Sequence, residues 1–441
     1  MIRRSVLRAP VALLFVAACS SPHATSTGPT AAVDSARVTT ASTSATAPAL
    51  SASAVATAPE PRGELDVDPS MFDFAAHPEL AARIAETPHS YFRFIGTPFR
   101  RAVCKAFESD LPTLPKVRLH GDPHAEQYAV TDLGRWLMDY DDAAVGPSVI
   151  DLVRMATSLI LATRQLGGTA ADADAAIAAL MKGYADGLDG KTPPTEPPAF
   201  AKPLVAKLSH DRKAFLEMVD KSMEVPLSKE AEAAARAELA DYVALLAKSG
   251  TKRPASFFEV RRVGSQKLGI GSALMRRYLF RLEGPTKSPD DDVVVEVKEV
   301  SDLSGASCVT GITDGVVVER AAAQRRAKLD KTLLAPILLS DKKFWASEWL
   351  SNYFEVRVKK LSGASDLAAL AHEAGEMLAI EHRKALPDGS LDSPKQGAPK
   401  QALELGAPLR DKISKVAVAL ADERESSWRR FKRDVAAPTE K

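Results

Sequence analysis

Hydrophobic residues recur at two different spacings along the chain, and the spacing changes near residue 257. Between residues 148 and 166, Ile150, Val153 and Leu159 lie on one face of a predicted helix. Further helices are predicted over 78–86, 170–188, 202–222, 229–249, 316–328, 366–383 and 409–435. Enrichment in Val, Phe, Leu and Tyr predicts strands over 257–263, 275–282, 293–300 and 354–361. Helices on both sides of a block of strands indicate the α+β class.

Two short apolar segments earlier in the chain each lead into a polar turn. The segment 117–119 precedes His120-Gly121-Asp122, and the segment 136–138 precedes Asp139-Tyr140-Asp141-Asp142. Alternation of strand and polar turn is typical of a β-hairpin. We therefore predict that these two strands form a hairpin that presents carboxylates at its ends.

The first residues predict an export signal rather than part of the fold. Three arginines precede the apolar stretch 11–18, and Val16-Ala17-Ala18-Cys19 has the form of a lipobox. A lipobox predicts lipidation of Cys19, whose acyl chains would hold the protein on a membrane. The alternative is a plain secretory signal that happens to be followed by a cysteine.

Residues 20–62 consist almost entirely of Ala, Ser, Thr, Pro and Val, which bury too little apolar surface to fold. An anchor followed by such a tether is the usual layout of a bacterial lipoprotein, which predicts a location in the cell envelope, outside the cytoplasm. The predicted organisation is a signal peptide at 1–18, a disordered tether at 19–65, a helical lobe at 66–250, a sheet lobe at 251–362 and C-terminal helices at 363–441 that pack on the helical lobe.

Composition limits the classes of partner. The 441 residues are 45% hydrophobic and 26% charged, with a net charge of +1. This balance is typical of a soluble globular protein and gives no reason to expect nucleic acid as a partner. After Cys19 only Cys104 and Cys308 remain. In an oxidising compartment they could pair, but their separation says nothing about proximity, so buried small hydrophobic residues are the first expectation.

The polar turn that begins at His120 is a candidate for phosphoryl transfer. Such transfer requires a carboxylate that orients the acceptor hydroxyl, and Asp122 is the candidate. A loop aspartate that only caps a turn is the structural alternative. His120 and His124 have the spacing of zinc ligands on a helix, but Pro123 between them disfavours a helix, so we expect them to hold the loop by packing and hydrogen bonds. A metal-dependent hydrolase that uses these histidines and the aspartates is a weaker, alternative hypothesis to phosphoryl transfer.

The acidic turn that follows supplies hard oxygen ligands. Asp139 and Asp141, with Asp142 beside them, suit a magnesium ion that also binds phosphate oxygens. A solvated acidic turn is the alternative, although three neighbouring carboxylates repel one another unless a cation or an arginine is near. Asp151, further along, is expected either to cap the next helix or to tie the loops together.

A candidate phosphate cradle lies between the predicted strands. Gly269, Gly271 and Ser272 form a glycine-rich turn, in which backbone amides can approach phosphate oxygens closely. Lys298 on a later strand can reach phosphates and needs a carboxylate partner, for which Glu319 on the next predicted helix is the candidate. A solvent-facing lysine on an edge strand is about equally compatible with this segment taken alone.

Taken together, these motifs resemble the bacterial family called domain of unknown function 2252 over about residues 71–430. The segments that carry the resemblance are Tyr91-Phe92-Arg93-Phe94-Ile95-Gly96, His120-Gly121-Asp122-Pro123-His124, Asp139-Tyr140-Asp141-Asp142-Ala143, Gly146-Pro147, Asp151-Leu152, Arg154, Gly269-Ile270-Gly271-Ser272 and Val297-Lys298-Glu299. The family looks similar to aminoglycoside phosphotransferases and other kinase-like proteins. The resemblance implies a two-lobed kinase-like fold whose lobes are circularly permuted, because the carboxylate turns precede the phosphate cradle.

Two positions depart from the family pattern. Gln127 stands where the family has an asparagine, which in related kinases holds magnesium, and Leu274 replaces the last glycine of the turn.

The motifs and the resemblance together lead us to expect a magnesium-dependent phosphotransferase. It would transfer a phosphoryl group from ATP or another donor to a small-molecule or other hydroxyl acceptor. Free ATP is scarce outside the cytoplasm, so the alternative is a non-catalytic kinase-fold lipoprotein that binds a small-molecule or protein ligand.

Overall fold

The computed structural model describes residues 62–131, 134–208, 211–223, 227–266, 269–271, 275–301, 303, 305–310, 333–341, 343–349, 353–384, 386 and 398–436. The chain divides into two units between residues 59 and 60, and everything described belongs to the second unit. The predicted export signal with Cys19, the helix 316–328 with Glu319, and Ser272 and Leu274 lie outside the described residues.

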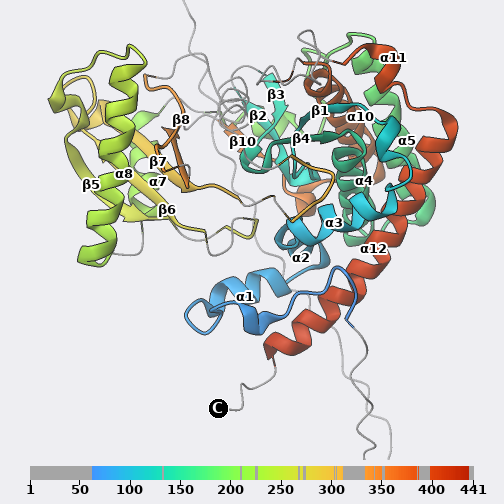
Figure 1. Ribbon diagram of the computed structural model, residues 1–441. Helices are drawn as coiled ribbons and strands as arrows, with labels where there is room; N and C mark the ends of the chain where they lie inside the picture. The colour runs from blue at the N-terminus through green and yellow to red at the C-terminus, as the bar shows by residue number, and fades with distance from the viewer. Residues whose placement is uncertain are drawn as a thin grey trace, which may run out of the picture. The chain divides into compact units, whose positions relative to one another are not determined.

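Helices and strands both contribute to the described chain, which confirms the α+β class (Figure 1). The longer helices are α1 (Pro78–Ala85), α2 (Pro88–Phe94), α3 (Gly96–Ala106), α4 (Val149–Gln165), α5 (Ala170–Leu188), α7 (Arg212–Ser222), α8 (Lys229–Lys248), α10 (Ala364–His382) and α12 (Ala407–Ala436). The single-turn helices α6 (Lys202–Val205) and α11 (Lys400–Leu403) add to them.

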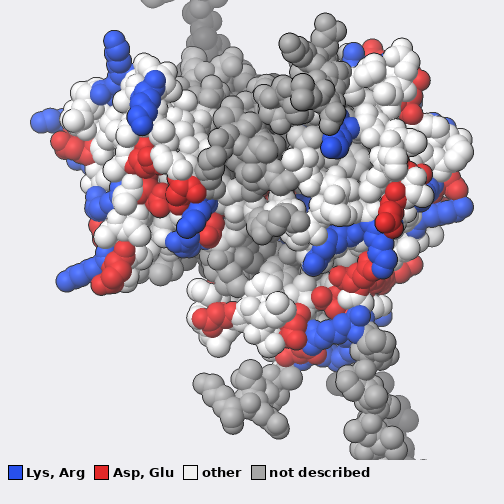
Figure 2. All heavy atoms as spheres, in the orientation of Figure 1, with Lys and Arg blue, Asp and Glu red and all other residues white. Residues whose placement is uncertain are grey.

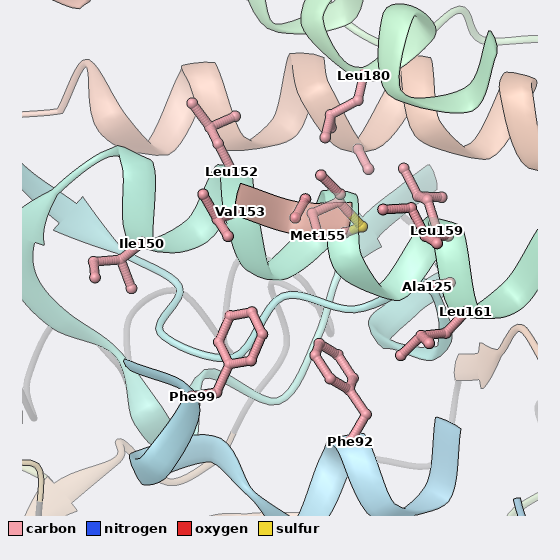
Figure 3. Close-up of a cluster of buried hydrophobic side chains, with 14 of the residues drawn as sticks. Phe92, Phe99, Ala125, Ile150, Leu152, Val153, Met155, Leu159, Leu161 and Leu180 are labelled. Atoms are coloured by element: carbon pink, nitrogen blue, oxygen red, sulfur yellow. The ribbon is translucent and has the colours of Figure 1, made fainter. Parts of the chain in front are cut away.

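Helix α4 is the centre of the larger core. Its residues from Val149 to Thr163 are all buried, and α2, α3, α5, α10 and α12 contact it. A helix that is covered on all sides needs no polar face. Figure 3 shows Phe92 of α2 and Phe99 of α3 pointing toward the apolar side chains of α4. The one-sided helical spacing in the sequence therefore understated how deeply this helix is buried.

A five-stranded antiparallel sheet forms the second structural layer. Its strands lie in the order β5 (Val260–Ser265), β6 (Arg277–Leu282), β7 (Val293–Glu299), β9 (Phe344–Glu348) and β8 (Ile337–Leu338). Helix α8 packs on one face of the sheet and α7 contributes to a separate apolar cluster with Leu279 and Val294 (Figure 1). Both helices therefore pack with the sheet, whereas the boundary expected near residue 250 grouped them with the preceding helices.

The predicted hairpin between the two polar turns is wrong. Strand β1 (Lys116–Leu119) pairs with β4 (Ala144–Pro147), whereas β3 (Gly134–Leu137) pairs with β2 (Tyr128–Thr131). Only two residues separate β2 from β3, so a local hairpin forms with little loss of chain entropy. Strand β10 (Tyr353–Glu355) then pairs with β2, which brings the beginning of the predicted strand 354–361 beside this hairpin. After β10, residues 358–360 form a single helical turn instead of continuing the strand.

The predicted helix 202–222 is interrupted. Asp211 has an extended backbone conformation, and its Oδ1 atom accepts a hydrogen bond from the Ala214 amide at 3.1 Å. An aspartate in this position starts a new helix, so α7 begins at Arg212. The other long helices agree with their predicted ranges to within two residues at most ends. Among the described residues, no helix combines the length and apolar character needed to cross a membrane.

Cys104 and Cys308 form a disulfide, whereas the sequence favoured two separate buried cysteines. Cys104 lies on α3, and Cys308 lies in the segment that follows β7 and also contributes Leu303, Ala306 and Val309 to the core around α4. The backbone of Thr310 in this segment bridges to Val145 of β4. The chain therefore returns from the sheet to the helical core directly after β7, and the disulfide fixes that return.

The charged surface is mixed. Figure 2 shows lysine and arginine side chains interspersed with aspartate and glutamate side chains on the face that it draws. This distribution agrees with the nearly neutral composition of the chain.

Candidate functional site

Asp151 fixes the turn that contains His120, Gly121 and Asp122. It lies in the first turn of α4 with no exposed surface, and its carboxylate accepts hydrogen bonds from the His120 amide at 2.7 Å and the Gly121 amide at 2.9 Å. His382, at the end of α10, lies 3.1 Å from the same carboxylate through Nε2. Asp151 does not cap α4 but ties the loop to two helices, which is one of the two roles expected from the sequence.

Gly121 brings the two polar turns into backbone contact. Its φ angle is +88°, and a Cβ atom at this position would lie 1.7 Å from the carbonyl oxygen of Asp142. A side chain of any kind would therefore collide with the acidic turn, and the left-handed conformation would add strain. Glycine at this position is the reason that Asp122 and the acidic turn adjoin.

Asp122 is held by a buried arginine. Its Oδ1 atom accepts a hydrogen bond of 2.7 Å from Nε of Arg154, whose guanidinium group lies 3.8 Å from the centre of the Phe92 ring and 4.9 Å from that of Phe99. Burial raises the pKa of Asp122, and the positive charge of Arg154 opposes that effect. The hydrogen bond from Arg154 reaches Oδ1, while Oδ2 lies 3.9 Å from His124 Nε2.

The two histidines of the loop differ in their hydrogen bonds, because the buried Nδ1 atom of His124 has no partner among the described residues. His120 Nε2 lies 2.8 Å from the carbonyl oxygen of Met138, and its Nδ1 accepts a hydrogen bond from the Asp122 amide at 3.4 Å. This arrangement leaves neither ring nitrogen of His120 for a metal. His124 is buried against His89, and burial lowers its pKa well below the usual range. The contacts of His120 disfavour its use as a metal ligand.

The acidic turn is balanced by two cationic side chains, those of Lys298 and Arg100. Asp141 forms an ion pair with Lys298, whose ammonium group lies 3.8 Å from Asp139 as well. Asp142 lies 3.3 Å from Arg100, which also donates to the Gly121 carbonyl at 3.0 Å. These ion pairs reduce the repulsion expected among three neighbouring carboxylates.

Asp139 has an unusual backbone and a polar neighbour. Its φ angle is +61°, the left-handed conformation that aspartate adopts more readily than most residues. The side-chain amide of Gln127 donates a hydrogen bond to Asp139 Oδ2 at 3.2 Å, and the Gln127 carbonyl accepts one from the Met138 amide. Gln127 and Asp139 are thus neighbours, as a shared metal site requires.

Lys298 reaches this turn from the third strand of the large sheet. It is 2% exposed, and its strand neighbour Arg277 forms an ion pair with Glu296, two residues before it on β7. Alternate residues on a strand share a face, so this pair and Lys298 line the same side of the sheet. Lys298 forms its ion pair with Asp141. Glu319, the partner expected from the sequence, lies outside the described residues.

The glycine-rich turn between β5 and β6 also approaches Asp122. Gly269, Ile270 and Gly271 are described, and a Cβ atom at Gly271 would lie 3.9 Å from Asp122 Oδ2. Ile270 is buried in the core around α4. The tip of the turn therefore packs on the helical core beside the carboxylate that we predicted to orient the acceptor.

Several functional neighbours were not identified from the sequence as site residues. The sequence analysis did not predict a role for Arg100 or Arg277, and it included Arg154 only in the family pattern. Arg154 follows Asp151 by three residues, which places both on one face of a helix, and this spacing could have indicated a buried arginine near the turn. Arg277 begins a strongly apolar strand, where a charge needs a partner.

Comparison with known sequences identifies the family. Residues 75–202 and 200–434 match the family described as "Uncharacterized protein conserved in bacteria (DUF2252)". No curated protein matches the chain. No solved structure matches it either. Because the two matched segments cover most of the chain, the protein belongs to the DUF2252 family.

Proposed function

We propose that this protein is a kinase-like phosphotransferase, with lobes circularly permuted in sequence, that transfers a phosphoryl group from ATP or another donor to an acceptor hydroxyl. The observation that carries the proposal is the meeting of Lys298 with Asp139 and Asp141 at a turn that adjoins Asp122. In phosphoryl transfer a lysine holds phosphates, a carboxylate binds magnesium and a second carboxylate orients the acceptor. These residue types lie together here, although they come from distant parts of the chain.

The order of the strands supports the same proposal. Protein kinases place a glycine-rich loop over the phosphates and the phosphate-binding lysine on the third strand. Here the glycine-rich turn joins β5 to β6, and Lys298 lies on β7, the third strand of the antiparallel sheet. The carboxylate turns precede this sheet in sequence, which is why we propose a circular permutation.

Magnesium fits the donor set in part. Asp139 and Asp141 offer carboxylate oxygens, and Lys298, which now pairs with Asp141, would turn to the phosphates. Gln127 directs its NH2 group at Asp139, so its carbonyl oxygen would reach an ion only after the amide rotates. When bound with a nucleotide, magnesium would neutralise phosphate charge. Asp122 would orient the acceptor hydroxyl, and Arg154 would hold the Asp122 carboxylate in place.

The second candidate is a non-catalytic protein that keeps the fold as a binding module. The ion pair of Arg277 with Glu296 favours it, because this pair lies on the same face as Lys298. Ligand pockets are mostly apolar, and a charged pair on this face is a poor surface for a nucleotide base. The same pair suits a polar ligand.

We also propose that the protein is a lipoprotein anchored through Cys19 in the cell envelope, outside the cytoplasm. The disulfide between Cys104 and Cys308 supports this location, because disulfides persist mainly in oxidising compartments. Replacement of Cys19 by alanine should move the protein from the membrane fraction to the soluble fraction. Retention of the variant in the membrane fraction would count against the anchor.

Thermal unfolding of the purified full chain tests the proposed activity. We expect a nucleotide with magnesium to raise the melting temperature of the wild type, and we expect Asp139→Asn to lose that rise. Asp290→Asn, a matched change on an exposed turn of the sheet, should keep it. If neither ATP nor GTP with magnesium shifts the wild type, the non-catalytic candidate is favoured.

A further inference from the structure

The crossing of α5 and α10 creates a second cluster of titratable side chains, formed by residues outside the proposed phosphotransfer site. A Cβ atom at Gly183 would lie 1.9 Å from the carbonyl oxygen of His372, and one at Gly375 would lie 2.3 Å from that of Leu180. The helices can approach this closely only because both positions lack a side chain. Asp186 on α5 is thereby placed beside His372 and Glu376 on α10.

These three side chains offer metal-ligand atoms within reach of one another. One atom from each of Asp186, His372 and Glu376 can be chosen so that all lie within 4.8 Å of one another. His372 and Glu376 are four residues apart on one helix face. His372 Nε2 is 2.9 Å from Asp186 Oδ2, while His372 Nδ1 is 3.9 Å from Glu376 Oε2.

Glu376 provides an independent indication that something is missing from this cluster. Its side chain is only 4% exposed, yet its Oε2 atom has no hydrogen-bond partner among the described residues. A buried carboxylate oxygen without a donor is unfavourable, because it has lost its hydrogen bonds to water without gaining others. Oε2 is also the atom nearest to His372, so it points into the cluster rather than toward solvent.

We propose that Asp186, His372 and Glu376 bind a divalent transition-metal ion, with zinc as the best match. Zinc accepts one imidazole nitrogen and carboxylate oxygens at about 2.0–2.2 Å in a tetrahedral arrangement, which puts neighbouring ligands roughly 3.3 Å apart. Rotation of the His372 ring and small shifts of the two carboxylates bring the three atoms to that spacing. Water would occupy the remaining position on the exposed side of His372, whose side chain is 30% exposed.

Two lysines balance Asp186 when no metal is bound. Lys182 and Lys191 lie 2.5 and 2.7 Å from its carboxylate, but their side chains are 67% and 59% exposed. Such exposed pairs contribute little to stability, so a metal can displace both ammonium groups into solvent. Glu376 has no such lysine among its described contacts and therefore gains the most from the ion.

Calorimetric titration of the metal-free full chain with zinc chloride tests the proposal. We expect one strong site per chain, weakened at least about tenfold by His372→Ala and by Glu376→Gln. Asp189→Asn changes an exposed carboxylate near the end of α5 and should leave the affinity unchanged. Asp139→Asn should also leave it unchanged, which separates this site from the proposed magnesium site.

Three results would overturn the proposal. The first is the absence of zinc binding by the wild type. The second is an affinity for zinc that is the same in Glu376→Gln, which keeps the size of the side chain, as in the wild type. Circular dichroism of each variant confirms that a loss of binding comes from the lost ligand and not from unfolding. Loss of zinc in Asp139→Asn alone would assign the ion to the other cluster and would also contradict the proposal.

Discussion

Replacement of Asp151 by alanine should destabilise the protein severely. The carboxylate is fully buried and accepts hydrogen bonds from two backbone amides, those of His120 and Gly121, and from His382. Each buried amide left without an acceptor costs about 1–3 kcal/mol. Loss of one partner in a buried charged network typically costs about 3–5 kcal/mol in total. We therefore expect Asp151→Ala to lower the free energy of unfolding by about 3–5 kcal/mol.

The asparagine variant refines this expectation. In Asp151→Asn the side-chain oxygen can replace Oδ2, which accepts from His120 and His382, but the NH2 group then faces the Gly121 amide. One amide loses its acceptor, so the loss should be about 1–3 kcal/mol, smaller than for alanine. The order wild type, asparagine, alanine is thus a direct consequence of the hydrogen-bond geometry.

Urea unfolding followed by circular dichroism measures both changes. Asp174→Ala, an exposed position on α5, serves as the control and should alter the free energy of unfolding by less than about 0.5 kcal/mol. The slope of the free energy of unfolding against urea concentration should be the same in all variants, so that differences in midpoint report differences in stability. If Asp151→Ala lies within about 1 kcal/mol of the wild type, the proposed role of Asp151 in holding the turn is refuted.

Three further predictions concern the same region and the disulfide. Gly121→Ala should lower the melting temperature and abolish any nucleotide-induced shift, because its Cβ would collide with the Asp142 carbonyl; a variant with wild-type stability would contradict the backbone contact. Cys308→Ser, which removes the disulfide with Cys104, should cost about 2–5 kcal/mol; a reductant should mimic this loss in the wild type and leave the variant unchanged. Burial lowers the pKa of His89 to about 4. The unfolded chain therefore binds more protons than the folded protein between about pH 6.5 and 4. As pH falls through that window, the free energy of unfolding of the wild type should fall by about 3 kcal/mol more than that of His89→Asn. Urea unfolding at pH 7 and at pH 4 measures this difference. An equal fall in the two proteins would show that His89 is not buried in its neutral form.

The sequence predicted elements with strong periodicity well and pairings poorly. The ranges 170–188 and 229–249 correspond closely to α5 and α8, because long helical patterns leave few alternatives. Strands β2 and β4 were missed, since four buried residues in a row show neither period. Without them the two polar turns were joined in a hairpin that the structure does not contain. Strand pairing depends on contacts between distant segments, which local pattern does not encode.

In the candidate site, too, some residues could be identified from the sequence and others could not. The residue types at Asp122, Asp139 and Lys298 were identifiable because phosphoryl transfer needs carboxylates and a lysine. Arg100, which contacts Asp142, was not identifiable because it acts through a contact across the fold, whereas the three-residue spacing of Arg154 from Asp151 could have indicated a buried arginine near the turn. The ion pair of Lys298 with Asp141 was not predicted, because Asp141 is distant in sequence and adjacent in space. Glu319, the partner that the sequence predicted, lies outside the described residues.

Binding of a magnesium nucleotide through Lys298 is the most direct test of the proposed function. Isothermal titration calorimetry of the full chain with magnesium and ATP should give one site, weakened at least about tenfold by Lys298→Met, which removes a charge-assisted contact to phosphate. Lys287→Met, on an exposed turn of the same sheet, should bind as the wild type does. Equal affinities of the wild type and Lys298→Met, or no binding by the wild type, would contradict the account.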